Sequence, residues 1–282
     1  MRGGRGIGIR TANPTMNDYA LFLDSQRYLK PHHFIIGIRK STTLLLYYYK
    51  KRANLRLVPR PSLAQFRSSY RAMSAVNYPP PFAALLNAES LEIQPNTGGY
   101  VKYIRELDRI YADEEKFQQL LESRGSDIAY RVNELRFTDC ANDLITGISV
   151  LNPGKVGSEF FMTRGHLHQR ADRPETYYCL SGHGILLMED LEGRVEAAEM
   201  RPGSLIYVPP FWVHRSVNIG SEIFATLFSY PADAGQNFEI VRKAGGFKLL
   251  VVDDADKGWK LVPNPRYSVR ARAEIEAYTL VG

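Results

Sequence analysis

The sequence predicts an all-β fold, either a β-sandwich or a small barrel, with one short helix before it. From residue 127 onward, runs rich in β-branched and aromatic residues recur about every ten residues, separated by Gly, Pro, Asn or Asp. Short strands with turn residues at such intervals are typical of sandwiches and barrels, and helical periodicity is almost absent from this region. The expected strands cover residues 144–151, 159–163, 176–180, 185–188, 204–208, 213–219, 223–230 and 247–252.

The segment before the strands contains the expected helix. Acidic residues 113–115 stand at its start, where negative charge favours the helix dipole, and Gly125 follows its end. The Pro-rich residues 73–100 predict an extended arm on the surface. The chain is therefore expected to consist of a leader at 1–72, an arm and helix at 73–126 that pack on the barrel, and the barrel with its site at 127–282.

The basic character of the chain is confined to its first quarter. The net charge is +6, but residues 1–72 hold 14 Lys and Arg against two acidic residues, which leaves the remainder at −6. Because this leader shows no clear helical or alternating period, it predicts a disordered tail, or a stretch upstream of a true start at Met73. Arg-rich, acidic-poor leaders can also be transit peptides or nucleic-acid-binding arms. The acidic remainder gives no reason to expect a nucleic-acid partner.

Cysteine content and hydropathy exclude two further classes of protein. Cys140 and Cys179 are too few for a disulfide framework and predict a reducing, cytoplasmic setting. Arg39 and Lys40 interrupt the longest apolar stretch, so no run of 18 apolar residues occurs and no membrane span is expected.

Three histidines and a glutamate in the β region form a candidate metal site. His166 and His168 are two residues apart, so both side chains leave the same face of a strand and can bind one ion. Glu175 restarts a strand beside them, and His214 begins a later strand after a Pro-Pro turn. An isolated histidine is more often an ordinary core or surface residue, but the whole set favours a metal site. Three imidazoles and one carboxylate suit Fe(II), Mn(II), Ni(II) or Zn(II) and leave two positions of an octahedral ion open.

At these residues the sequence resembles the cupin superfamily. Its first motif is H-x-H-x6-E-x6-G at residues 166–182, and its second is G-x5-P-x4-H-x3-N at 203–218. The long gap between His168 and Glu175, and Phe211 where many cupins have Gly, are typical of the cupin-type (archaeal-type) glucose-6-phosphate isomerases. The resemblance covers residues 100–267 and is close in PGKVG at 153–157, EFFMTRGHLH at 159–168, YVPPFWVHRSVNIG at 207–220 and YPADAG at 230–235.

The resemblance implies a double-stranded β-helix barrel of two antiparallel sheets, a homodimer, and roles for individual residues. The residues that match the family's metal ligands are His166, His168, Glu175 and His214. The positions that match the surroundings of the sugar phosphate are Tyr130, Ser149, Thr163 and Gly165. The residues expected to act on the substrate are Glu175, Tyr177 and Tyr230. Gln236 and Phe238 replace a His and a Tyr that are common in the family, so no acid–base role is assigned to these two positions.

The function implied by the resemblance is metal-dependent isomerisation of glucose 6-phosphate to fructose 6-phosphate, a step of glycolysis and gluconeogenesis, with one divalent ion per subunit and Fe(II) favoured. A divalent ion can stabilise a developing enediolate as a Lewis acid, and Glu175 is then expected to shuttle the proton. A direct hydride shift needs no such base, and the sequence leaves both mechanisms open. Two alternatives use the same ligands: a metal-dependent cupin oxygenase, which would need a dry apolar pocket, and a non-catalytic sugar-binding cupin.

Overall fold

The chain divides into two compact units, residues 1–77 and 78–282. The structure is a computed structural model that describes residues 20–22, 33–40, 43–50, 56–57 and 80–279. The boundary between the units lies close to the end of the leader that the sequence delimits. The remaining parts of that leader lie outside the described residues.

The described residues of the first unit form a four-stranded antiparallel sheet in the order β1-β2-β3-β4. Its strands are β1 (Ala20–Phe22), β2 (His33–Lys40), β3 (Thr43–Lys50) and β4 (Arg56–Leu57). These strands lie within the leader, for which the sequence predicts a disordered tail or a stretch upstream of a true start at Met73. Residues 44–49 are apolar at successive positions and so lack the alternation that marks a half-buried strand. They still pair as a strand, because Leu and Tyr suit an extended backbone. The strands do not test whether the leader belongs to the working protein, which stays a prediction.

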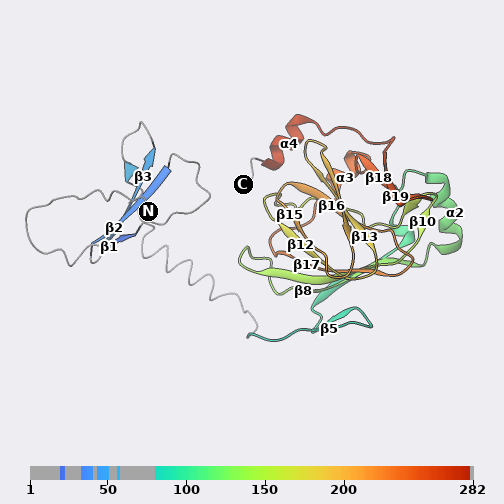
Figure 1. Cartoon of the computed structure of the whole chain (residues 1–282), viewed down its shortest axis with the longest axis horizontal. Coiled ribbons are helices and arrows are strands. Elements are labelled where there is room, and N and C mark those ends of the chain that lie inside the picture. Colours follow the sequence, from blue (N-terminus) through green and yellow to red (C-terminus); the bar gives the residue numbers. More distant parts are fainter. Residues whose placement is uncertain (1–19, 23–32, 41–42, 51–55, 58–79, 280–282) are drawn as a thin grey trace, which may run out of the picture. The chain divides into compact units, whose positions relative to one another are not determined.

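The second unit is the all-β barrel that the sequence predicts. Within residues 80–279 its strands are β5 (Leu85–Asn87), β6 (Glu92–Gln94), β7 (Gly98–Tyr103), β8 (Ile128–Leu135), β9 (Leu144–Leu151), β10 (Lys155–Val156), β11 (Glu159–Phe160), β12 (Glu175–Ser181), β13 (Gly184–Asp190), β14 (Val195–Met200), β15 (Leu205–Val208), β16 (Trp212–Asn218), β17 (Phe224–Pro231), β18 (Leu249–Asp254) and β19 (Gly258–Pro263). The two main sheets are antiparallel, with the orders β15-β12-β17-β9-β8-β7 and β14-β13-β16 (Figure 1). Two smaller sheets, β10-β11-β18-β19 and β5-β6, complete the described part of the unit.

All eight expected strands correspond to observed strands, and β9 has the expected bounds. Strand β11 is shorter than expected, because after Phe160 the chain continues beside β16 through isolated bridges at Met162 and His166 rather than through a continuous ladder. Strand β14 was not expected. Its sequence, VEAAEM, contains Ala and Glu, which are depleted in strands, and it forms because all six of its residues pair with β13.

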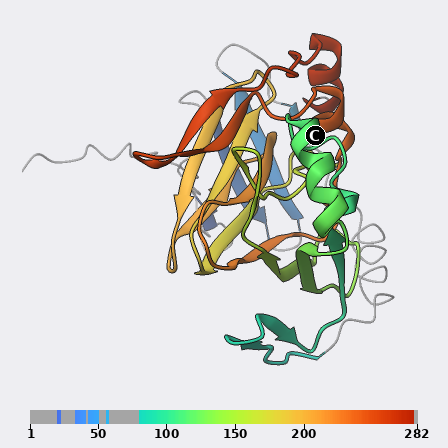
Figure 2. The same ribbon diagram turned by 90° about the vertical axis from the view of Figure 1, so that its right-hand side faces the viewer.

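The expected helix is α2 (Glu114–Arg124). The Asp113 side chain caps it by accepting a hydrogen bond from the Lys116 backbone N–H at 2.9 Å, and Phe117 buries its inner face. Figure 2 shows α2 in green along the outside of the barrel. The elements that were not expected are the 3₁₀ turn η1 (Ile104–Glu106) and helices α3 (Glu239–Lys243) and α4 (Arg272–Thr279). No helix among the described residues is long and apolar enough to cross a membrane.

The arm at 73–100 is more structured than the sequence predicts. Strands β5 and β6 form a hairpin, and β7 joins the edge of the six-stranded sheet beside β8. Leu91 and Ile93 of the hairpin segment are buried against Ile148, Val150 and Ala225 on the outer face of that sheet. The prolines predict an extended arm, but alternate apolar residues allow the segment to bury one face.

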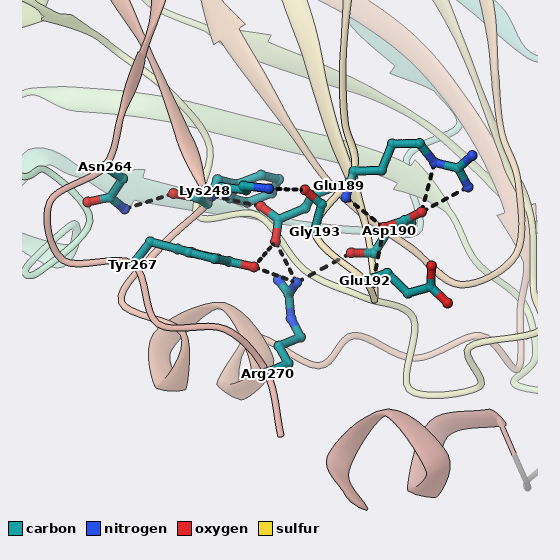
Figure 3. Close-up of polar contacts among 10 residues, drawn as sticks. Glu189, Asp190, Glu192, Gly193, Lys248, Asn264, Tyr267 and Arg270 are labelled. Carbon is teal, nitrogen blue, oxygen red and sulfur yellow. Dashed lines mark hydrogen bonds and ion pairs between the residues drawn. The ribbon is translucent and has the colours of Figure 1, made fainter. Parts of the chain in front are cut away.

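A buried ion pair fixes the segment after β19 to the barrel. Arg270 Nη1 lies 2.5 Å from Glu189 Oε1 on β13, and both side chains are almost fully buried. The Tyr267 hydroxyl donates to the same oxygen at 2.8 Å, and the Lys248 backbone N–H donates to Glu189 Oε2 at 2.7 Å. Figure 3 shows these groups converging on the Glu189 carboxylate. Because its charge is matched and both oxygens accept hydrogen bonds, this carboxylate can be buried beside the core.

Candidate metal centre and substrate cavity

The four candidate ligands, which the sequence spreads over about fifty residues, meet inside the barrel. His166 and His214 lie opposite each other in an antiparallel bridge, in which each backbone N–H donates to the other's carbonyl. His168 follows two residues later, and Glu175 is the first residue of β12. One ligand atom from each of the four side chains can be chosen so that all lie within 4.8 Å of one another. The structure therefore brings together the set that the sequence proposed.

The Glu175 carboxylate lies between two of the imidazoles. Its Oε2 is 2.9 Å from His214 Nε2 and 3.2 Å from His168 Nε2. All four side chains are buried, and His166 is the most exposed at 9%. Because these four side chains are shielded from water on most sides, the electrostatic interactions among them are stronger than they would be at the surface.

The other nitrogens of two histidines are fixed by backbone carbonyls. His168 Nδ1 lies 2.7 Å from the Arg173 carbonyl oxygen, and His214 Nδ1 lies 3.1 Å from that of Trp212. A carbonyl oxygen only accepts, so we assign the Nδ1 atoms as protonated donors. Each neutral ring then directs an Nε2 lone pair toward the centre, which is the arrangement that orients imidazoles in metal sites.

This arrangement fits a cation. With Nδ1 protonated, two Nε2 lone pairs and a negative carboxylate oxygen face one another at hydrogen-bond distance, which is unfavourable unless a positive charge lies between them. His166 Nε2 is buried and has no hydrogen-bond partner among the described residues. Three imidazole nitrogens and one carboxylate oxygen are ligands for a divalent first-row metal ion. The residues present therefore fit the metal that the sequence analysis expects.

The charges of the cluster agree with this assignment. Without a cation, the His168 and His214 rings can donate to the carboxylate from Nε2 once they are protonated. Burial alone would raise the pKa of Glu175, but these hydrogen bonds outweigh burial and hold that pKa well below its ordinary value. Burial, followed by repulsion from the other two imidazoles, lowers the pKa of His166 well below its ordinary value. Glu175 is therefore negative at neutral pH, and His166 is neutral with a lone pair available.

The turn before His214 contains the residue that replaces the usual glycine. Phe211 has φ = +68°, in the left-handed region that favours glycine. Its backbone N–H donates to the Ala171 carbonyl at 2.7 Å. The turn thus keeps a glycine-like conformation without glycine, and the hydrogen bond ties it to the loop that leads into Glu175.

A cavity of about 310 Å³ opens beside the cluster. Its lining includes all the expected substrate-binding and catalytic positions, which are Tyr130, Ser149, Thr163, Gly165, Glu175, Tyr177 and Tyr230. His166 also lines the cavity, whereas His168 and His214 are not part of its lining. The placement supports the expected site without testing what each residue does.

One wall of the cavity is a tightly constrained loop. The Thr163 backbone N–H donates to the Ser216 carbonyl at 2.9 Å, and Thr163 Oγ1 accepts from the Ser216 N–H at 3.1 Å. Gly165 has φ = +76°, and a Cβ added there would lie 2.8 Å from a ring carbon of Phe247. The position therefore requires glycine both for its conformation and for its close packing.

Tyrosines line the cavity near the cluster. Burial, followed by the negative charge of Glu175, raises the pKa of Tyr177 well above its ordinary value. Burial raises the pKa of Tyr130 to about 12, and it raises that of Tyr230 as well. The rings of Tyr177 and Tyr230 lie 5.9 Å from His214 and 5.4 Å from His168, respectively. All three hydroxyls stay protonated at neutral pH and can donate hydrogen bonds.

The structure adds cavity residues that the sequence reasoning missed, among them Tyr100, Glu134, Arg136, Arg164 and Ser216. Tyr100 comes from β7 in the arm and packs edge-on against Tyr130 at 6.2 Å. The alternation of β8 places Tyr130, Val132 and Glu134 on one face, which is the signal that could have identified Glu134. Gln236 and Phe238 also line the cavity, and Phe238 lies 5.8 Å from the His166 ring.

Comparisons with known proteins agree with the geometry. The family model for glucose-6-phosphate isomerase matches residues 101–267. The chain is 43% identical over 197 residues to the glucose-6-phosphate isomerase of Sinorhizobium medicae, covering 70% of this chain and 92% of that protein. It is 40% identical over 194 residues to that of Thermococcus gammatolerans, covering 69% and 100%. A solved oxalate oxidase structure is 16% identical, with a TM-score of 0.33 over 39% of this chain and 55% of that one, too weak a likeness to support an inference.

The matched residues 101–267 contain all four candidate metal ligands and all the expected substrate positions. The match extends over more than half of the chain, so the chain belongs to the glucose-6-phosphate isomerase family.

Proposed function

We propose that this chain interconverts glucose 6-phosphate and fructose 6-phosphate in the cavity beside His166 and Glu175. One observation carries the proposal: a buried cluster that fits one divalent cation borders a cavity lined with tyrosine, serine and threonine hydroxyls. Membership of the isomerase family supports the same reaction. An aldose–ketose isomerase must bind a polar sugar phosphate and move a hydrogen between C1 and C2, and the cavity offers groups for both tasks.

The phosphate end of the substrate is assigned to the wall formed by Tyr130, Ser149, Thr163 and Gly165. Hydroxyls and the Gly165 backbone N–H can bind phosphate oxygens without a full positive charge at the point of contact. The left-handed conformation of Gly165 and its close packing support this assignment, because they fix the direction of its N–H. Tyr177 and Tyr230 are assigned to the sugar, as protonated hydroxyls that orient C1 and C2.

His166, His168, Glu175 and His214 are assigned to one divalent cation per subunit, with Fe(II) favoured by the family resemblance. Such a cation would supply Lewis acidity to the two substrate oxygens at C1 and C2. The donor set is preorganised, because the carbonyls of Arg173 and Trp212 fix the rings of His168 and His214. Mn(II), Ni(II) and Zn(II) suit the same donors.

Glu175 is assigned to proton transfer as well as to metal binding. Its low pKa keeps it in the basic form at neutral pH, and it lines the substrate cavity. When a carboxylate takes the proton from C2 of the open-chain sugar, a double bond forms between C1 and C2 and O1 gains a proton. When O2 then loses its proton to become the ketone oxygen, the same carboxylate can return a proton to C1. The competing mechanism is a hydride shift, which requires only that the side chains hold C1 and C2 in line.

The nature of the cavity argues against the two rival functions. An oxygenase with the same ligands needs an apolar pocket that protects reactive oxygen species, whereas hydroxyls line this one. A non-catalytic sugar-binding protein has no need for four buried converging ligands, and all four are present.

Dimerisation and a cytoplasmic location complete the proposal. Thr176 and Tyr178 on β12 pair with Tyr207 and Leu205 on β15, which places these side chains on one outer face of the six-stranded sheet. Leu205 and Tyr207 are 69% and 58% exposed. An exposed apolar group of this kind supports a homodimer contact, and the absence of paired cysteines supports a reducing compartment.

A coupled assay of fructose 6-phosphate isomerisation tests the function. The protein is stripped with a chelator, reloaded with Fe(II), Mn(II), Ni(II) or Zn(II) in turn, and assayed without oxygen. We expect no activity after stripping and recovery with at least one metal. Failure with all four metals would exclude the isomerase, and consumption of oxygen in a parallel aerobic assay would favour the oxygenase.

A further inference from the structure

A second cavity, of about 500 Å³, lies against the substrate cavity. The two share three lining residues, Arg164, Gly165 and Phe238. The loop that forms one wall of the substrate cavity therefore also forms a wall of this second cavity. The rest of the lining comes from residues 108–110, from Arg215 on β16, from α3 and from the chain between α3 and α4.

The lining of the second cavity is strongly basic. Five arginines line it against two acidic residues, Asp108 and Glu239. Asp108 pairs with Arg109 at 3.2 Å, and Glu239 pairs with Arg242. Among the described residues, no carboxylate lies within ion-pair distance of the other three arginines, which are Arg164, Arg215 and Arg266. The cavity thus carries positive charge that the fold does not neutralise by direct contact.

One of these positive charges, that of Arg215, is buried in the protein interior. Its side chain is 3% exposed, and its Cζ lies 4.3 Å from the centre of the Phe247 ring. Nη2 donates to the Arg164 carbonyl at 2.6 Å, but Nε is buried and has no hydrogen-bond partner. Burial lowers the pKa of Arg215 to about 10, so the guanidinium remains charged at neutral pH. The buried Glu159 carboxylate favours the charged form of Arg215 only from beyond ion-pair distance, so the guanidinium would gain from an anion in direct contact.

We propose that this second cavity binds an anion bearing a phosphate group, either free phosphate or a small phosphorylated metabolite, at a site distinct from the substrate's own phosphate. Arginine is suited to such a ligand because its planar fork donates paired hydrogen bonds to phosphate oxygens. Arg164 and Arg266 would contact the anion from the wall and the rim, and Arg215 would contribute its charge from the interior.

The shared wall couples the two sites. With the substrate phosphate on the wall that includes Gly165, as proposed above, an anion in the second cavity would lie on the other side of Arg164 and Gly165. The two anions would repel each other and compete for the charge of Arg164. Each anion must then weaken the binding of the other by the same factor. Anion binding at the second site would therefore inhibit the isomerase when phosphorylated anions accumulate.

Inhibition by inorganic phosphate tests the proposal kinetically. Phosphate at the substrate site alone raises the apparent KM linearly with its concentration. Binding at the second site, which weakens the binding of substrate and of active-site phosphate by the same factor, adds an increase that saturates, so the plot starts steeply and then curves downward to the linear slope. We expect curvature in the wild type and a straight line in Arg242→Glu and in Arg266→Glu, which reverse charge at exposed positions of the second cavity. The matched control is Arg201→Glu, an exposed arginine outside the lining, which should keep the curvature.

Equilibrium dialysis with labelled phosphate tests the same site without catalysis. Each of the two cavity variants should bind one phosphate fewer per chain than the wild type, and Arg201→Glu should bind as many. Repeating the titration with glycerol 3-phosphate distinguishes the sources: binding of both ligands indicates a phosphorylated metabolite, and binding of phosphate alone indicates the free ion. A straight line in the wild type, unchanged stoichiometry in the cavity variants, or an equal loss in Arg201→Glu would overturn the proposal.

Discussion

The Glu175 and His214 side chains, 39 residues apart in the chain, meet with Glu175 Oε2 only 2.9 Å from His214 Nε2. Glu175 begins β12 in the six-stranded sheet, and His214 lies on β16 in the three-stranded sheet. The contact therefore joins the two main sheets at the site itself. Because the Trp212 carbonyl holds the far side of the His214 ring, the carboxylate faces a lone pair whose repulsion a bound cation would relieve.

Metal binding is expected to fall as the pH is lowered. A ligand imidazole must lose its proton to bind a metal ion, and an ordinary histidine titrates near 6.5. Burial lowers the pKa of His168, but its hydrogen bond to Glu175 outweighs burial and raises that pKa above the ordinary value. Proton competition at His168 should therefore begin above about pH 6.5, and affinity should drop steeply below about pH 6. Metal titrations from pH 5 to 8 measure this, and a flat profile would contradict the ligand set.

Changing Glu175 to Gln separates metal binding from proton transfer. Glutamine keeps an oxygen that can coordinate but removes the negative charge and the basic site. We expect turnover at saturating metal to stay about 10²–10⁴-fold below wild type, the usual contribution of a positioned general base. Deuterium uptake from solvent at C2 of glucose 6-phosphate is the companion measurement. A near-normal rate together with no deuterium uptake would favour the hydride shift and leave the isomerase standing.

Gly165→Ala should damage the site more than the fold. The added Cβ would lie 2.8 Å from the Phe247 ring and 3.0 Å from Arg215 Nε, so the loop must shift. A displacement near 1 Å at a positioned group can cost about 10²-fold in rate, and we expect a loss of that order in kcat/KM. The matched control is Gly203→Ala, which also has a positive φ, +96°, but no atom within 4 Å of the added Cβ. Equal kinetic losses in both variants would show that conformation, and not packing, decides.

Arg270→Met should strongly destabilise the protein. It leaves the Glu189 carboxylate buried without its cation, which typically costs about 3–5 kcal/mol in the free energy of unfolding. The control is Arg194→Met, which removes an exposed partner of the adjacent Asp190 and should cost less than about 1 kcal/mol. Urea unfolding of both variants measures the difference. The double variant Arg270→Met with Glu189→Met should recover part of the loss, because it removes both charges.

Removal of residues 1–72 should leave the isomerase intact. The family match begins at residue 101, and every residue of the candidate site lies in the second unit. A protein beginning at Met73 should keep the activity and the melting temperature of the full chain. A drop of several degrees, or a loss of activity, would show that the sheet formed by β1 to β4 contributes to the working protein.

Local patterns of the sequence were sufficient for most of the barrel strands and for α2. Turn residues and β-rich runs are short-range signals, so β9 could be predicted to the residue, and the start of α2 follows from the acidic residues 113–115. The same reasoning missed β14 and the leader sheet. In β14 the residue preferences oppose a strand and pairing with β13 overrides them, and the leader strands lack the alternation that the reasoning required.

By itself, the sequence determined the candidate ligands, because their identity and spacing already define a donor set for one divalent ion. Only the tertiary structure decided what surrounds them. Tyr100 and Glu134 reach the substrate cavity through the register of β7, β8 and β9, and Arg215 is buried beside the second cavity with no carboxylate within ion-pair distance among the described residues. Register and burial depend on contacts between residues far apart in the chain, and no local pattern encodes which distant side chain or cavity a residue will meet.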